Sequence, residues 1–293
     1  MEDAYYTAKD KRFRSSPDWE ELTIANDFIF GKVMQDKELC LELLKRILSD
    51  LEIIDIEYPE PQKTIREDID ARSVRLDVYV KSNDGMLVYD IEMQTGNYVS
   101  LPKRTRYYTS QMDLELLDRG RDYENLPNMF VIFIMQRDIF GQGRHIYTFR
   151  NICVEDRETE LNDMTTKIFL TTAGTMDDVS PELRRLLDYV GGKPSEDDYT
   201  RKLDDAVKAA KRKREWRREY MFMSLKYHDV VYDAKHEGLE EGRAEGLEEG
   251  IMASAAMMRS FGHTEEEILQ GIMTHFNLTR EQAESYLCQE QTC

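Results

Sequence analysis

The chain has 293 residues, of which 41% are hydrophobic and 33% are charged, and its formal net charge at pH 7 is −18. The apolar fraction excludes a wholly disordered chain, and the length indicates one large domain with an addition, or two domains. The longest apolar run, 129–135, is much shorter than the roughly 20 residues of a membrane span, so we expect no membrane association. A surface this acidic repels nucleic acid as a whole, although a local basic strip could still bind it.

Two features predict a cytoplasmic protein. The N-terminal residues contain no apolar segment of the kind that directs secretion. The cysteines have irregular spacing and no C-x-x-C pair, which fits neither a zinc ribbon nor a disulfide framework; they are Cys40, Cys153, Cys288 and Cys293. We therefore expect free thiols.

The residue pattern divides the chain into four parts. Residues 1–22 are polar and predict an N-terminal arm, whereas 23–193 contain the periodicities of a folded domain. Residues 195–250 predict a long helix to about His236 and then a Glu/Gly-rich repeat. Each glycine there costs a helix about 1 kcal/mol, so we expect the helix to persist only where packing supports it. Residues 251–293 predict a small segment of short helices.

Within 23–193, the spacing of apolar residues alternates between that of helices and that of β-strands. Asn26 or Asp27 is a candidate N-cap of a first helix, and a second helix is predicted from Lys37 to Leu51, before two prolines that end it. The alternation from Val74 to Gln94, with Asp84-Gly85 in its middle, predicts a β-hairpin. Further elements are a helix from 101 capped by Ser100, a buried strand at 128–135 suited to parallel pairing, strands at 145–151 and 167–172, and a helix at 181–190.

The hairpin brings acidic residues together. If Asp84 and Gly85 are the central residues of a type I′ turn, paired residue numbers sum to 169, and Asp77 lies opposite Glu92. A slipped register would place Asp77 opposite Asp90 instead.

Carboxylates that face each other in this way repel, and Asp90 on the same face adds to the repulsion. A divalent cation between them would relieve it, and oxygen ligands of this type suit Mg²⁺ or Mn²⁺. The alternative interpretation is a solvated acidic face that Arg75, opposite Gln94, helps to neutralise.

The order of these elements resembles that of the PD-(D/E)XK nuclease superfamily, and in particular its transposase-like branch, the recombination-promoting nucleases. The segments that carry the resemblance are NDFIFGKVM, RLDVYV with Asp77, DIEMQ with Glu92 and Gln94, and LPKRTRYYTSQMDLELLDRGRDYENLPNMFVIFI. It covers 23–175 and, more loosely, the tail to 250. The resemblance implies an α/β fold with a restriction-endonuclease-like core, a mixed central sheet and flanking helices, followed by a helical C-terminal region.

The resemblance also implies Mg²⁺- or Mn²⁺-dependent hydrolysis of DNA phosphodiesters, with no small-molecule cofactor. Asp77, Glu92 and the backbone carbonyl of Met93 would hold the ion, which would polarise the scissile phosphate and lower the pKa of the attacking water. Gln94 would complete the catalytic set. It stands where the superfamily usually has lysine, and its amide can orient a water but carries no charge.

The helix after the hairpin carries supporting candidates. Arg104, Tyr108 and Gln111 are spaced four and three apart, so they share one face, and the first two match the Arg-x-x-Tyr-Tyr pattern of the branch. Asp27 is a candidate extra acid, with a role as N-cap the alternative. The basic run 208–218 either grips DNA phosphates or is a solvated helix.

Three functions remain open at this point: a metal-dependent endonuclease, a catalytically silent DNA-binding member of the same fold, and an oligomerising adaptor. The presence of both Asp77 and Glu92 favours the endonuclease. The expected partners are DNA and a second copy of the chain, bound through the C-terminal helical region.

Overall fold

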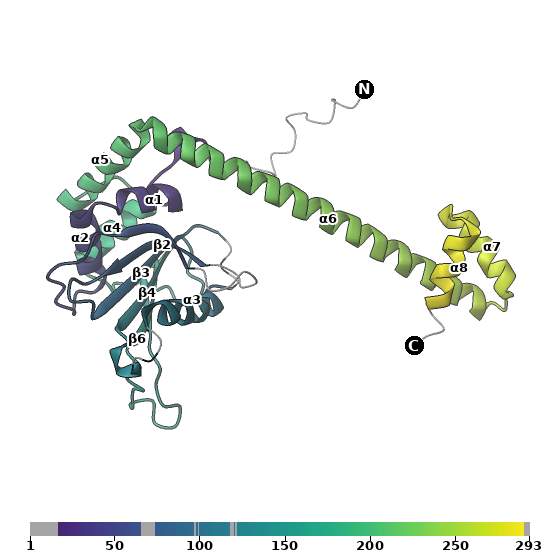
Figure 1. Ribbon diagram of the computed structural model, residues 1–293, viewed down its shortest axis with the longest axis horizontal. Helices are drawn as coiled ribbons and strands as arrows, with labels where there is room; N and C mark the ends of the chain where they lie inside the picture. The colour runs from purple at the N-terminus through teal and green to yellow at the C-terminus, as the bar shows by residue number, and fades with distance from the viewer. Residues whose placement is uncertain are drawn as a thin grey trace. The chain divides into compact units, whose positions relative to one another are not determined.

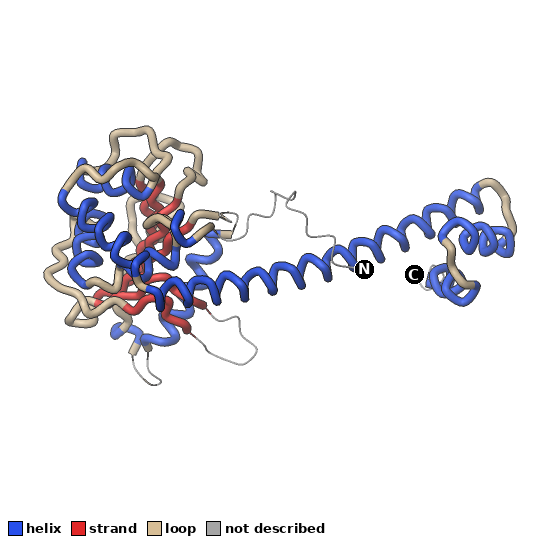
Figure 2. The backbone as a smooth tube through the Cα atoms, turned by 90° about the horizontal axis from the view of Figure 1, so that it is seen from above, coloured by secondary structure: helices blue, strands red, loops and turns tan. Residues whose placement is uncertain are grey.

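The computed structural model describes residues 17–65, 74–96, 98, 100–117, 120 and 122–289. The chain forms two compact units, Met1–Tyr220 and Met221–Cys293. The first contains the β-sheet and the second contains the C-terminal helices (Figures 1 and 2). None of the described helices is both long enough and apolar enough to span a membrane.

A mixed sheet of six strands forms the centre of the first unit, in the order β1-β2-β3-β4-β6-β5. Its strands β1, β2 and β3 are antiparallel, β4 lies parallel to both β3 and β6, and β5 is antiparallel to β6. The predicted buried parallel strand is therefore confirmed as β4. The strands are β1 (Glu60–Ile65), β2 (Val74–Lys81), β3 (Leu87–Gln94), β4 (Asn128–Met135), β5 (Ile146–Phe149) and β6 (Thr165–Thr171).

Helices cover both faces of this sheet. Figure 1 shows α3 on one side and α1, α2, α4 and α5 gathered on the other. Leu101, Tyr108 and Met112 of α3 belong to a core cluster with Val131 and Phe133 of β4. The helices are α1 (Asp27–Val33), α2 (Lys37–Ile47), α3 (Leu101–Leu116), α4 (Pro181–Val190) and α5 (Asp198–Arg212). This architecture confirms the α/β class and the restriction-endonuclease-like core that the resemblance implied.

The hairpin has the predicted register and a different turn. Val78 pairs with Ile91, so paired numbers sum to 169. A type I′ turn needs positive φ at both central residues, but only Gly85 has it, at 71°. The Gly85 amide instead donates to the Ser82 carbonyl oxygen at 2.9 Å, and the Asp84 carboxylate accepts from the Ser82 hydroxyl. The longer loop is symmetric about the same centre, so the register is unchanged.

Four other expectations need correction. Trp19 and Leu22, placed in the N-terminal arm, are buried, and Trp19 begins a short 3-10 helix. The strand β1 was not predicted, because Pro61 argues against a strand except at an edge, which is where β1 lies. Ser100 precedes α3, but its side chain makes no capping hydrogen bond. The helix predicted from Ser195 is two helices, because Lys213 is extended between α5 and α6 (Arg214–Ser260).

The Glu/Gly-rich repeat is helical throughout, as part of α6. Apart from the neighbouring backbone of the helix itself, nothing within the described chain lies within 4 Å of the position that a Cβ would take at Gly238, Gly242 or Gly246. The helix thus persists without the packing that we expected it to need. The second unit has its own core, in which Ile251 and Ala255 of α6 pack with α7 (Glu265–Phe276) and α8 (Arg280–Gln289).

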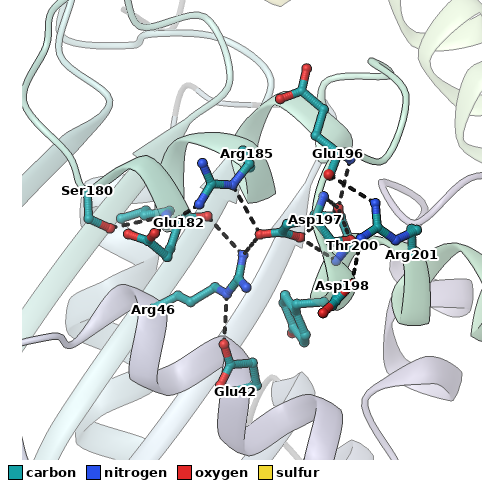
Figure 3. A network of polar contacts seen from close by, with 12 residues as sticks. Glu42, Arg46, Ser180, Glu182, Arg185, Glu196, Asp197, Asp198, Thr200 and Arg201 are labelled. Atoms are coloured by element: carbon teal, nitrogen blue, oxygen red, sulfur yellow. Dashed lines mark hydrogen bonds and ion pairs between the residues drawn. The ribbon is translucent and has the colours of Figure 1, made fainter.

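An ion pair between α2 and α5 ties the helices of the first unit together (Figure 3). Arg46 Nη1 lies 2.7 Å from Asp197 Oδ2, and Arg46 also donates to the Glu182 carbonyl oxygen at the start of α4. The Asp197 carboxylate accepts from the Thr200 amide at 2.8 Å, which caps α5. Partial burial alone would raise the pKa of Asp197, but the hydrogen bonds from Thr200 and Arg46 reverse this and hold that pKa well below its ordinary value.

We expect Asp197→Asn to destabilise the protein by about 2 kcal/mol at pH 7, because it removes the carboxylate that Arg46 and Arg185 share and leaves Arg46 only its pair with Glu42. A carboxyl with a lowered pKa stabilises the fold above its ordinary pKa and loses that contribution in acid, so the deficit should shrink below about pH 4. Arg201→Ala, which removes an exposed pair with Asp198, is the control and should cost about 0.5 kcal/mol or less. Urea unfolding gives the free energy of unfolding of both variants. Equal losses of stability would contradict the role of Asp197 as the residue that joins α2 to α5.

Candidate active site

At Asp77, hydrogen bonds from backbone amides to carboxylate side chains replace the backbone-to-backbone hydrogen bonds between β2 and β3. The register places Asp77 opposite Glu92, but the backbone pairing of β2 with β3 begins only at Val78. At this point the Asp77 amide donates to Glu92 Oε1 at 2.9 Å, and the Met93 amide donates to Asp77 Oδ2 at 2.9 Å. On the other side, Gln62 of β1 has a φ of 53° where the register places it opposite Asp77. The two carboxylates thus take the place of backbone acceptors, and this fixes their positions.

Three carboxyl groups are buried at this site. Asp77 is 8% exposed, Glu92 is 3% exposed and Asp90 is 0% exposed. Neither carboxyl oxygen of Asp90 accepts from an N–H or hydroxyl group of the described chain, although its carboxyl can share a proton with that of Glu92. The hydroxyl of Tyr79, which lies opposite Asp90, also has no partner within the described chain. The site therefore holds more acceptor oxygens than it holds donors.

Burial raises the pKa of each of these three carboxyl groups well above its ordinary value. Repulsion between neighbours adds to this effect: Glu92 and Asp27 raise the pKa of Asp77, Asp77 raises that of Asp90, and Asp90 raises that of Glu92. Without a cation, the cluster retains protons at a pH where exposed carboxyls have lost them.

Arg104 of α3 contacts three of the predicted site residues. Its guanidinium donates to Gln94 Oε1 at 2.8 Å and to the Tyr108 hydroxyl at 2.8 Å, and it lies 3.5 Å from Glu92 Oε2. The Gln94 side-chain amide donates in turn to the Gly96 carbonyl oxygen. The structure therefore brings Asp77, Glu92, Gln94, Arg104 and Tyr108 together. Gln111 is buried on the same helix, at 6% exposed.

Asp27 lies at the edge of this cluster, and Asn26 is the N-cap of α1. Asn26 Oδ1 accepts from the Ile29 amide at 3.2 Å, so the interpretation of Asp27 as the N-cap is wrong. Asp27 Oδ2 lies 3.9 Å from the Arg75 guanidinium, and the Asp27 charge contributes to the raised pKa of Asp77.

A glycine allows α1 to approach this part of the sheet. A Cβ at Gly31 would lie 3.4 Å from the Asp77 carbonyl oxygen and 3.8 Å from the Pro61 Cβ, at ordinary van der Waals distance, so this position has room for little more than a methyl group.

Residues 25–174 match the family described as PD-(D/E)XK nuclease family transposase. The chain belongs to this PD-(D/E)XK family. The matched range contains all six strands, α3 and the whole acidic cluster. No curated protein and no solved structure matches the chain.

Two features of this PD-(D/E)XK site could not be read from the sequence. The pattern placed Asp90 beside the other acids but could not show that its oxygens are buried without donors. The distortion at Gln62 had no signal at all, because neither glycine nor asparagine marks the position.

We expect Asp90→Asn to stabilise the protein in the presence of a chelator, because it removes a buried charge that lacks a partner. The pKa of Asp90 is raised, so its ionisation costs nothing below about pH 4 and progressively more as the pH rises. The gain should therefore grow between pH 5 and pH 8 and reach about 1 kcal/mol or more.

The matched control is Asp84→Asn in the turn of the same hairpin. Hydrogen bonds from Ser82 and Met86 lower the pKa of this exposed carboxyl, so the substitution should bring no gain. Thermal melts of both variants in EDTA measure the difference, and a loss of stability in Asp90→Asn at pH 8 would contradict the prediction.

Proposed function

We propose that this chain is a metal-dependent DNA endonuclease that hydrolyses phosphodiester bonds. The observation that carries the proposal is the facing pair Asp77 and Glu92, buried and fixed by hydrogen bonds from backbone amides. Membership of a family described as nucleases supports DNA as the substrate. The predicted cytoplasmic location remains a prediction.

The donor set of this site fits Mg²⁺ or Mn²⁺. Within the described part of the chain, no three His, Cys, Asp or Glu side chains are arranged to hold a metal ion. The proposed ligands are only two carboxylates, those of Asp77 and Glu92, with the Met93 carbonyl oxygen as the third. The excess of buried acceptor oxygens around Asp90 favours a cation here. When bound, the ion would polarise the scissile phosphate and lower the pKa of the attacking water.

Arg104 supplies the positive charge that Gln94 lacks. Its guanidinium donates to the Gln94 amide oxygen at 2.8 Å and lies 3.5 Å from Glu92 Oε2, so a positive charge stands beside both residues. A guanidinium there can donate to a phosphate oxygen and stabilise the charge that develops in the transition state. In this arrangement Gln94 holds Arg104 in place and can orient a water through the same amide.

We also propose that the chain self-associates through α6. Exposed apolar residues recur at heptad spacing along this helix: Leu225 is 63%, Tyr232 is 49% and Leu239 is 60% exposed. Residues seven apart lie on one side of a helix, so this row offers apolar contacts along α6 to a second copy of the chain. Light scattering should report a dimer, and Leu225→Glu with Leu239→Glu should make it a monomer. Phe261→Glu, at an exposed residue beyond α6, should leave the dimer intact.

We expect Mg²⁺-dependent nicking of supercoiled plasmid DNA that Asp77→Ala and Glu92→Ala each abolish, because one carboxylate cannot hold the ion in place. Gel electrophoresis of timed reactions measures the rate. Full activity in excess EDTA, or in either variant, would refute a metal-dependent reaction at Asp77 and Glu92, whereas wild-type protein that does not nick DNA would favour the catalytically silent or adaptor function.

We expect Gln94→Lys to lower the nicking rate about 10-fold or more, because it places a second cation beside Arg104 and repels the metal ion. Gln94→Ala should reduce turnover while it barely changes the affinity for Mn²⁺. Calorimetric titration of Mn²⁺ gives the affinity separately from the rate. Equal rates in wild type, Ala and Lys variants would assign Gln94 a purely structural role.

A further inference from the structure

A basic patch lies where α5 ends and α6 begins. The stretch 208–218 contains seven basic residues and one acidic residue, in a chain whose net charge is −18. Six of the basic side chains are exposed, and the five at the break between the two helices form what we call the basic junction: Arg212, Lys213, Arg214, Arg217 and Arg218. Such a concentration of one sign against the overall charge indicates an anionic ligand.

The backbone at this point adds to the attraction for anions. Lys213 is extended, with φ −78° and ψ 109°, so a new helix of 47 residues begins at Arg214. The first amides of a helix lack intrahelical acceptors, and the positive end of its dipole disfavours basic side chains there. Lys213, Arg214 and Arg217 are therefore unfavourable at this position unless an anion binds them, since Glu215 is the one acidic residue of the first turn.

Few acidic side chains neutralise the basic junction. Arg217 lies 3.4 Å from Glu20, and Lys213 lies over the ring of Trp216 at 3.7 Å. Arg212, Arg214 and Arg218 make no ion pair with the described part of the chain. Three exposed guanidinium groups thus remain available, and guanidinium groups bind phosphate oxygens in a bidentate manner.

The basic junction is anchored beside the acidic cluster through α1. Lys32 of α1 lies 2.8 Å from Glu219, and Phe28 packs against Tyr220 with ring centroids 5.5 Å apart. The first residue of the same helix is Asp27, at the edge of the site. A helix of seven residues is about 10 Å long, which corresponds to about three base pairs of DNA. Figure 1 shows α1 between the sheet and the start of α6.

We propose that the basic junction binds the phosphate backbone of the same DNA duplex whose scissile phosphate lies at Asp77 and Glu92, a few base pairs away along it. The inference rests on the proposed function for the identity of the substrate. Contacts of this type fix the position of a duplex without reading its sequence. The basic junction would therefore hold the DNA across a protein surface that otherwise repels it.

The inference is tested by measuring DNA binding in EDTA, where a metal-dependent nuclease cannot cleave the duplex. Fluorescence anisotropy with a labelled 30-base-pair duplex in EDTA gives the dissociation constant between 50 and 200 mM salt. Arg214→Gln with Arg218→Gln should weaken binding at least 10-fold and make the slope of log K against log salt shallower by about 2, since each phosphate contact contributes about 0.9. Lys45→Gln with Lys202→Gln removes the same charge from exposed positions elsewhere and should leave the slope unchanged.

Equal salt slopes for the two double variants would overturn the inference, as would wild-type protein that does not bind the duplex. Light scattering on the same samples tests whether the basic junction binds protein instead of DNA. If the double variant changes the oligomeric state and leaves the DNA affinity unchanged, the basic junction is a protein contact and the proposal is refuted. Plasmid nicking is measured separately. If the wild type nicks DNA and the Arg214→Gln, Arg218→Gln variant has an unaltered salt slope, only the inference about the basic junction is contradicted. Salt-sensitive binding by a protein without nicking activity would contradict the proposed function alone.

Discussion

Two hydrogen bonds from backbone amides to carboxylates, at Asp77 and Glu92, decide how the site is built. They end the regular pairing of β2 with β3 and turn two acidic side chains into parts of the sheet. Because the acceptors are side chains, their positions depend on the backbone and need no bound ligand. Gly31 brings α1 against the same point from one side, and Arg104 of α3 approaches Glu92 from the other. The electrostatic cost of three buried acids is thus concentrated where a cation could offset it.

Much of this fold follows from periodicity. The alternation on both sides of Asp84-Gly85 was enough to pair Asp77 with Glu92, because the hydrophobic faces fix the register whichever turn joins the strands. The turn itself depended on a hydrogen bond from Ser82 to Asp84, which no pattern reports. Other features lacked a local signal. Neither glycine nor proline marks the break between α5 and α6 at Lys213. Pro61 argued against a strand, although β1 is a strand at the edge of the sheet. Neighbouring Asn26 and Asp27 are equally good caps by residue type, and only the helix geometry distinguishes them.

The distribution of charge matters more to this protein than its total. In the proposed complex with DNA, the acidic groups of the site would need a cation before a phosphate could approach, whereas Arg104 and the basic junction would attract phosphates directly. The acidic surface elsewhere would suppress nonspecific binding, since a duplex that shifted away from these few basic groups would meet repulsion. On this proposal, charges that repel contribute to discrimination between productive and unproductive encounters as much as charges that attract.

The glycines of α6 affect how the two units are joined. From Gly238 to Gly246 the helix has poor intrinsic propensity and no packing from the described chain, so its hydrogen bonds depend on helix formation alone. The sheet and the cluster around Ile251 have buried cores of their own. This stretch can therefore open and close by local unfolding while both cores remain folded, and its amide hydrogens exchange with solvent long before those of the sheet.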